Sequence, residues 1–326
     1  MIGPLVVIAG LSAFGFRTAV PLVSRQVGQI VLGTAIGLHF TPVVAAFVAR
    51  YTFYICGAAL VSMLFGGVLS LLLARTSSIG RSTAFFASMP GGVAEMAVLA
   101  ERYGGETGLV ALAQSIRVMF IVIVVPLALG FLGVTGTDID MSATTPFDPF
   151  KLGVMLCGSV VAGFVLAKGR VMNAWLIGPL AVGVLIAVNQ WPHSQVPRLF
   201  INAGQVLIGA SLGLRFRREL ITRLGRFIPS ALLNTALLVL FSVGFAALIA
   251  DLTGLQTGNL VLALAPGGVA EMSITAQVLQ LAVPLVTAFH VTRMVFVVLL
   301  SAPIFRGARY LYARRQEAIS RRQTQH

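Results

Sequence analysis

Long stretches without a charged residue restrict this chain more than any other feature of its sequence. Tyr51–Ala74, Val118–Thr137 and Phe227–Ala250 contain no charge at all. A helix needs roughly 20 mostly apolar residues to cross the hydrocarbon core of a bilayer, so each stretch can span a membrane. Further expected spans are Leu152–Ala167, Val171–Pro197, Ala282–Phe305 and the N-terminal Met1–Phe16. The sequence therefore predicts an all-α polytopic membrane protein that has the lipid bilayer as a partner.

The composition supports this class. Only 10% of the residues are charged and 57% are hydrophobic, whereas soluble proteins contain about 25% charged residues. The net charge of +13 comes from basic residues that lie mainly between spans and at the C-terminus, where they orient a chain in the membrane. Cys56 and Cys157 both lie within expected spans, so the sequence predicts neither a disulfide framework nor a zinc site.

The segment PGGVAEM occurs twice, at Pro90–Met96 and at Pro266–Met272, 176 residues apart. Seven further residues recur at the same interval: Gly28, Gln29, Gly33, Gly37, Leu38, Arg117 and Phe120 match Gly204, Gln205, Gly209, Gly213, Leu214, Arg293 and Phe296. Self-similarity at a fixed interval is the signature of an internal repeat. We therefore expect two homologous membrane repeats of about five spans each.

These repeats divide the chain into four parts. Residues 1–133 form the first repeat, 134–150 an acidic external linker, 151–305 the second repeat and 306–326 a basic cytoplasmic tail. The second repeat begins with an additional span, Leu152–Ala167, and the first lacks an equivalent leading helix.

Charges outside the spans predict that the two repeats are inverted. The linker Leu132–Phe150 contains three aspartates and no basic residue, so we expect it on the external side of the membrane. Basic residues then fall in segments on the cytoplasmic side, as the positive-inside rule requires; they include Arg17, Arg25, Arg75, Arg81, Lys168, Arg170, Arg215, Arg217, Arg218, Arg223, Arg226, Arg306 and Arg309. This alternation holds if each PGGVAEM segment enters and leaves on one side as a re-entrant hairpin. If the segment instead spans the membrane as a broken helix, the repeats are parallel.

The repeated motif combines a helix breaker with a carboxylate. Each copy has one proline and two glycines, Pro90, Gly91 and Gly92 or Pro266, Gly267 and Gly268. Proline lacks the backbone donor and glycine weakens a helix, so we expect an interruption followed by a new half-helix. Glu95 and Glu271 fall in its first turn, where free amide groups and the helix dipole favour a negative charge. Paired interrupted segments in two halves are typical of a transporter binding site.

An arginine follows each glutamate at the same distance along the chain. Arg117 and Arg293 lie in apolar sequence, and ionisable groups inside a membrane usually pair with one another or line a pathway. The two glutamates and two arginines could form a neutral cluster that binds a solute or an ion. Alternatively, they form two Glu–Arg clamps that only hold the interrupted helices.

Other polar residues near the motif are also candidates for binding. In the second copy, Ser273 replaces Ala97 and His290 replaces Gln114. His290 could titrate near neutral pH or form hydrogen bonds between helices. Gln29 and Gln205 could face the site or bond to a neighbouring helix, whereas the glycines that follow them at four-residue spacing predict close helix packing.

These motifs together are similar to those of a known family. The sequence IGPL at Ile2–Leu5 and Ile177–Leu180, GQ followed by glycines at four-residue spacing, PGGVAEM and the later arginine resemble the bacterial AbrB-duplication family of inner-membrane proteins. The resemblance covers nearly the whole chain. It implies inverted repeats like those of secondary transporters, and family members have been named AbrB-family regulators or ammonia monooxygenases.

Two functions fit these features. One is a secondary transporter or permease for an unknown small solute or ion, and the other is a membrane-embedded regulator of gene expression that acts through a partner. The sequence does not favour an enzyme, because His39, His193, His290 and His326 are scattered and no group of residues has metal-ligand spacing. We expect no cofactor and no direct contact with nucleic acid, and the protein could form a homo-oligomer.

Overall fold

The computed structural model describes residues 2–13, 21–134, 136, 145–171, 173–214 and 225–323, and within these ranges the chain is helical without any strand. The helices are α1 Ile2–Ala13, α2 Leu22–Gly37, α3 Pro42–Arg50, α4 Thr52–Ser77, α5 Arg81–Ser88, α6 Val93–Arg102, α7 Thr107–Phe131, α8 Pro149–Lys168, α9 Ala174–Val188, α10 Arg198–Gly213, α12 Phe227–Thr253, α13 Thr257–Leu264, α14 Val269–Val278 and α15 Val283–Gln323.

Five of the described helices are long and apolar enough to cross a membrane. They are α4, α7, α8, α12 and the part of α15 from Val283 to Tyr310. The bent pair α2 and α3, with 88° between its two helices, would be a sixth span if it crosses as one element. The predicted class, an all-α polytopic membrane protein, is confirmed.

Three expected spans differ from the helices that the structure contains. α7 begins at Thr107, well before Val118, and ends at Phe131, because Gly133 with φ of 63° ends the helix. The stretch Val171–Pro197 contains only the 15-residue α9, and the segment after Gln190, with φ of 55°, leaves helical geometry. In the N-terminal stretch, the described helix α1 has 12 residues, which is fewer than a span needs.

The N-terminus of α8 is capped by the last aspartate of the linker. The Asp148 carboxylate accepts hydrogen bonds of 3.0 and 3.1 Å from the backbone N–H groups of Phe150 and Lys151. Lys151 Nζ also lies 3.3 Å from Asp148 Oδ2. The pKa of Asp148 is lowered mainly by the hydrogen bond from the Lys151 backbone, since this bond favours the ionised carboxylate.

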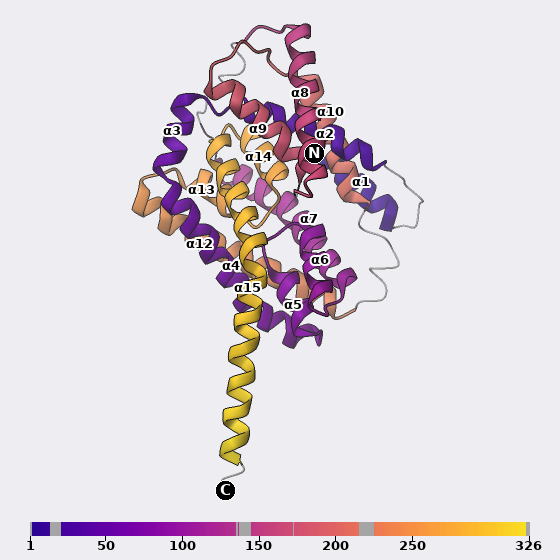
Figure 1. Cartoon of the computed structure of the whole chain (residues 1–326), viewed down its shortest axis with the longest axis vertical. Coiled ribbons are helices and arrows are strands. Elements are labelled where there is room, and N and C mark those ends of the chain that lie inside the picture. The colour runs from indigo at the N-terminus through magenta and orange to yellow at the C-terminus, as the bar shows by residue number, and fades with distance from the viewer. Residues whose placement is uncertain are drawn as a thin grey trace.

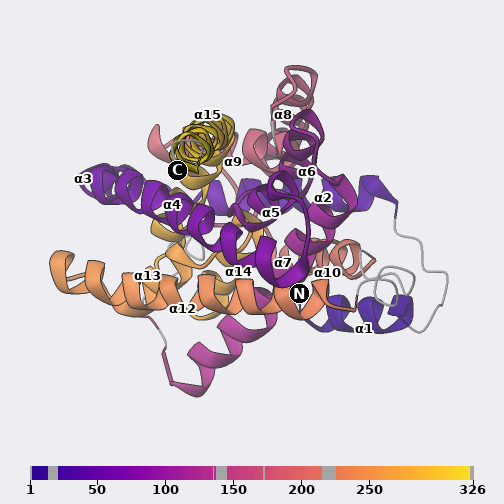
Figure 2. The same ribbon diagram turned by 90° about the horizontal axis from the view of Figure 1, so that it is seen from below.

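The helices form two groups. α1, α2, α8, α9 and α10 pack mainly on one another, and α4 to α7 pack with α12 to α15. In Figures 1 and 2, α1, α2 and α10 lie on one side of α15, and α3 and α13 lie on the other. Contacts of α2 with α14 and α15 join the groups, and apolar residues such as Leu32 and Leu180 continue the core across the join.

Glycines allow the first group to pack at backbone contact, as the sequence predicted. A Cβ on Gly28 of α2 would lie 2.8 Å from the carbonyl oxygen of Gly204 in α10. A Cβ on Gly37 would lie 2.8 Å from Cα of Gly183 in α9, and one on Gly33 would overlap the backbone near Leu176. Real Cβ atoms do not approach backbone so closely, so a larger residue at these positions would push α2 away from its neighbours.

The second group contains two short pairs of helices, α5–α6 and α13–α14, which we call hairpin 1 and hairpin 2. Their helices begin at residues 81 and 257, and at 93 and 269, and the helices that follow begin at 107 and 283. Each pair of starts is 176 residues apart, the interval of the sequence matches. The duplication and the inversion of the repeats remain predictions, and the geometry of the hairpins bears on both.

Candidate functional site

Each hairpin is interrupted at the proline of its PGGVAEM motif. Met89 and Ala265, the residues before the prolines, have ψ of 132° and 133°, because proline disfavours helical geometry in the residue that precedes it. The chain turns at the proline, where the Gly91 N–H donates to the Met89 carbonyl at 2.8 Å and Gly267 does the same to Ala265. Helical geometry resumes at Val93 and Val269.

The two ends of each hairpin lie together. The backbone N–H of Glu106, after α6, donates a hydrogen bond of 3.0 Å to Thr83 Oγ1 at the start of α5. The backbone N–H of Ala282, after α14, donates one of 2.9 Å to Asn259 Oδ1 at the start of α13. Each PGGVAEM segment therefore folds back on itself and leaves near the point where it entered, as a re-entrant element does.

The intramembrane arginines bind the carbonyl groups at the breaks. Arg117 donates hydrogen bonds of 2.7 Å to Met89 O and 3.0 Å to Gly91 O. Arg293 donates bonds of 2.7 Å to both Ala265 O and Gly267 O. These carbonyls lie at the break, outside the regular helical hydrogen-bond pattern, and the guanidinium fork donates to two of them at once.

A polar residue one turn before each arginine completes the clamp. Gln114 Nε2 donates to Phe86 O at 2.8 Å and to Met89 O at 2.9 Å, and its Oε1 accepts from Arg117. In the second hairpin, His290 Nε2 bonds to Leu262 O at 2.9 Å and Nδ1 bonds to Arg293 at 2.8 Å. Because a guanidinium has only donors, Nδ1 accepts and the proton of the neutral ring is on Nε2.

At both glycines of each motif, neighbouring side chains occupy the space that a Cβ atom would fill. A Cβ on Gly92 would overlap the Glu95 carboxylate, and one on Gly268 would overlap that of Glu271. A Cβ on Gly91 or Gly267 would lie 2.9 Å from Cγ of the methionine that ends the motif, Met96 or Met272. Both carboxylates are thus folded over the N-terminus of a half-helix, where the free amide groups favour their charge.

The two breaks meet on α15. Arg293 binds the break of hairpin 2, and a Cβ on Gly91 at the break of hairpin 1 would lie 2.8 Å from Cγ1 of Val297. Four residues separate these two positions, about 6 Å along a helix.

The hairpins approach this point from opposite ends of α15. The open end of hairpin 2 is fixed at Ala282, just before α15 begins, whereas Phe85 of hairpin 1 packs on Phe305 with ring centroids 5.1 Å apart. Figure 1 shows α13 and α14 beside the first part of α15 and α5 and α6 nearer to its far end. This opposed arrangement is the one that inverted repeats would produce.

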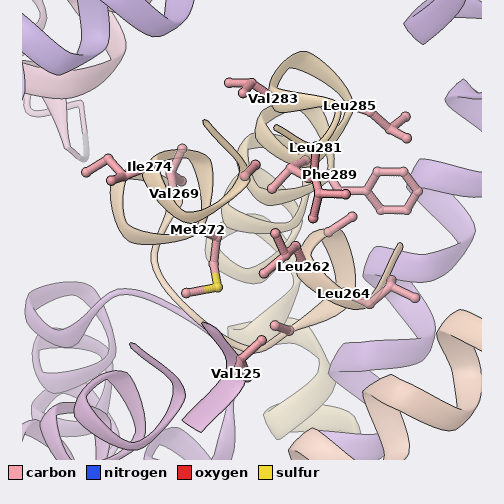
Figure 3. Packing of buried hydrophobic residues seen from close by; sticks show 14 of the residues in the cluster. Val125, Leu262, Leu264, Val269, Met272, Ile274, Leu281, Val283, Leu285 and Phe289 are labelled. Carbon is pink, nitrogen blue, oxygen red and sulfur yellow. The ribbon is translucent and has the colours of Figure 1, made fainter. Parts of the chain in front are cut away.

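Apolar side chains enclose the break of hairpin 2. In Figure 3, Met272 points from α14 toward Val125 of α7, Leu262 of α13 lies beside it, and Leu264 lies further along the same segment. All four side chains are buried in one cluster with Phe289 of α15. The charged groups at the break are therefore held in an apolar surrounding.

Among the described residues, which include all four side chains, neither Glu95 nor Glu271 forms an ion pair with Arg117 or Arg293; a direct Glu–Arg clamp was one of the two alternatives that the sequence left open. The two arginines use their Nη groups on backbone carbonyls, and the glutamates lie over the amide ends of α6 and α14. The sequence interpretation missed that a break takes carbonyl groups out of the helical hydrogen-bond pattern on one side and amide groups on the other. Each charge compensates one of these ends.

The structure brings some of the remaining candidates to the site and leaves others away from it. His290 is part of the Arg293 clamp, and Ser273 is buried on α14 with its hydroxyl bonded to Thr287 at 2.7 Å. Gln29 on α2 is buried, and Gln205 on α10 is half-buried; both helices belong to the first group. Neither glutamine forms a hydrogen bond to a described residue of the two hairpins.

Two polar contacts near the site were not predicted. Ser88, the last residue of α5, donates a weak bond of 3.5 Å to Asn234 Oδ1 on α12, and both residues are buried. Gln114 was noted only as the counterpart of His290, although it forms the first clamp. Its position three residues before Arg117 was the available signal, since residues at that spacing share a helix face.

Over the described ranges, no group of three His, Cys, Asp or Glu residues could hold a metal ion.

The fold and the site define a polytopic α-helical membrane protein with two opposed, arginine-clamped hairpins. The chain belongs to the AbrB family, because the model of the family described as "Transition state regulatory protein AbrB" matches residues 1–309. The predicted family is therefore confirmed.

Two similar proteins cover most of the chain. "Putative regulator AbrB" of Escherichia coli (strain K12) is 25% identical over 324 residues, which are 98% of this chain and 92% of that protein. "Uncharacterized protein YhjN" of Bacillus subtilis (strain 168) is 26% identical over 314 residues, 90% of this chain and 80% of that protein.

Proposed function

We propose that this protein is a secondary transporter or permease for a small solute, which binds where the breaks of the two hairpins meet. The observation that carries the proposal is the opposed arrangement of the hairpins, with their breaks about one helical turn apart on α15. Backbone that leaves helical geometry inside a membrane is tolerated where protein buries it or where it lines a cavity. Two such breaks at a similar depth in the membrane would give a solute access to polar groups from either side of the membrane.

The polar groups at the breaks are suited to a small polar or charged solute. Arg117 and Arg293 are 3% and 5% exposed, and the Nε–H of each is a buried donor without a partner among the described residues. A buried donor without a partner costs about 1–3 kcal/mol, so its retention in both halves favours a role in binding. A bound solute or water would supply the missing acceptor.

The two groups of helices also favour transport. α2, α9 and α10 are fixed to one another by glycine contacts, whereas the hairpins and their arginines all belong to the second group. Movement of the second group against the first would expose the breaks to one side and then to the other. Such rocking of one bundle around a site is the usual route to alternating access.

We propose that the protein lies in the bacterial inner membrane with its C-terminus in the cytoplasm. The basic residues of the last part of α15, including Arg306 and Arg309, favour the cytoplasmic side. We further propose that the protein is not an enzyme and binds neither a cofactor nor nucleic acid. Its partners would be lipid, the transported solute and, if it oligomerises, further copies of the chain.

Solute profiling tests transport without a prior guess at the solute. Small molecules in cells and medium are compared by mass spectrometry between cells that produce the wild type, Arg293→Ala, or no protein. Arg102→Ala is the matched control, because Arg102 is exposed at the end of α6. We expect one class of solute to change with the wild type and Arg102→Ala, but not with Arg293→Ala. If a folded wild type leaves every solute unchanged, or if folded Arg293→Ala behaves as the wild type, the proposal fails.

A membrane-embedded regulator is the second candidate. It is favoured by the family description, by the name of the Escherichia coli relative and by the helical extension of α15 beyond Phe305, which projects from the bundle in Figure 1. A partner could bind this extension. A regulator would lose its effect on gene expression when the chain is cut after Phe305 and would keep it in Arg293→Ala, whereas a transporter would show the reverse.

A further inference from the structure

The two glutamates of the repeated motif do not have the same environment. Glu271 is only 6% exposed, whereas Glu95 is half-buried. Their positions in the motif are the same, because each carboxylate lies over the second glycine at the start of a half-helix. The difference therefore comes from the packing around α14 and not from the motif.

The Glu271 carboxylate has no hydrogen-bond or ion-pair partner among the residues that the structure describes, although Arg293 is on the neighbouring helix. Arg293 uses its Nη groups on the carbonyls of Ala265 and Gly267 and on His290. Burying an ionised carboxylate without a paired cation costs much more free energy than burying its protonated form. The amide end of α14 acts in the other direction, because it favours the ionised form.

From this geometry we infer that Glu271 is the proton-exchanging group of the transport cycle and that Glu95 is not. The inference rests on the proposed function, for which it names the coupling ion. Burial disfavours a charge on Glu271 and the amide end of α14 favours one, so the exposure of this side chain to water bears on which form is preferred. Movement that opens hairpin 2 to water would favour loss of the proton, and closure would favour its uptake.

The charges around Glu271 are compatible with this exchange. α15 presents His290 and Arg293, α7 carries Arg117, α2 has Arg25 as its one charged residue, and α13 has no titratable side chain. With both glutamates ionised, the two break arginines and the two motif glutamates are formally neutral. Binding of one proton by Glu271 leaves one net positive charge at the breaks, and its release restores neutrality.

Infrared spectroscopy of the full chain in lipid nanodiscs tests the inference without a solute. Difference spectra between acidic and alkaline buffer report the carbonyl stretch of protonated carboxylic acids. We expect a band from a buried acid in the wild type, its loss in Glu271→Gln and its retention in Glu95→Gln, the matched change at the equivalent position. Glu271→Asp, which keeps an acid, should retain a band with a shifted titration midpoint. This second variant also covers the case in which Glu271→Gln does not fold.

The inference is overturned if the band of the buried acid persists in folded Glu271→Gln, if it is lost in Glu95→Gln, or if Glu271→Asp abolishes it. These outcomes are independent of solute profiling. A Glu271 proton with no change in any solute would contradict transport but not the proton site. A transported solute without a titrating Glu271 would contradict the proton site and leave transport standing.

Discussion

His290 Nδ1 accepts a hydrogen bond of 2.8 Å from the guanidinium of Arg293, and this bond fixes the imidazole in its Nε2–H tautomer. The ring then donates to the carbonyl of Leu262, so His290 links Arg293 to the last turn of α13. In hairpin 1 the amide of Gln114 does the same for Arg117, with its oxygen as the acceptor and its nitrogen as the donor.

Because the two residues have the same role, His290→Gln should be tolerated. A glutamine can accept from Arg293 and donate to Leu262 O, so we expect the free energy of unfolding to fall by less than about 1 kcal/mol. His290→Leu fills the space but has no polar atoms, so it should cost about 1–3 kcal/mol through the unpaired donor and acceptor. Thermal unfolding in detergent measures both. Equal losses for Gln and Leu would contradict this role of His290.

The clamps require the fork of an arginine. Lysine has one ammonium group and cannot bond in parallel to two carbonyls in the fixed geometry of a guanidinium. Arg117→Lys and Arg293→Lys should each lower the free energy of unfolding by about 2–4 kcal/mol, because buried carbonyls lose their donors.

Arg102→Lys is the control for the lysine variants, since Arg102 is exposed and a surface change usually stays within about 0.5 kcal/mol. If Arg293→Lys is no more damaging than Arg102→Lys, the guanidinium does not hold the break.

Packing of α2 on α9 gives a prediction about glycine. Gly183→Ala would place a Cβ 2.6 Å from the carbonyl oxygen of Thr34, so the helices must separate. Overpacking of this kind costs about 1–3 kcal/mol. Gly57→Ala on α4 is the matched control, because nothing lies within 4 Å of its added Cβ. Unfolding measurements that find the two variants equally stable would refute the close contact.

The cap of α8 should depend on pH. The pKa of Asp148 is lowered in the folded protein, so its stabilising effect is complete above the usual pKa of about 3.9 and is lost as the pH falls through the folded value. Relative to their intrinsic exchange rates, the amides of Phe150 and Lys151 should therefore be less protected from hydrogen exchange in that acidic range. Asp148→Asn keeps an acceptor but cannot titrate, so it should remove the pH dependence. Persistence of the dependence in Asp148→Asn would assign it to another group.

The sequence was sufficient to predict the class, the family and the position of both interruptions, because proline, glycine and apolar length act locally. The helix that starts again behind the glycines, with a glutamate in its first turn, was predictable for the same reason. The partner of Arg117 was not, since it depends on carbonyl groups that only the break exposes. The short α9 was missed because composition alone does not show where Gln190 turns the chain.

The central claim is that the two hairpins enter the membrane from opposite faces, and labelling of single cysteines tests it most directly. Arg102→Cys and Val278→Cys place a thiol at equivalent, exposed positions near the open ends of hairpins 1 and 2, in a chain with Cys56→Ser and Cys157→Ser. A membrane-impermeant maleimide is applied to intact spheroplasts or to inside-out vesicles. Our account predicts that each preparation labels one of the two variants and that the two preparations label different ones. Labelling of both from the same face would contradict it.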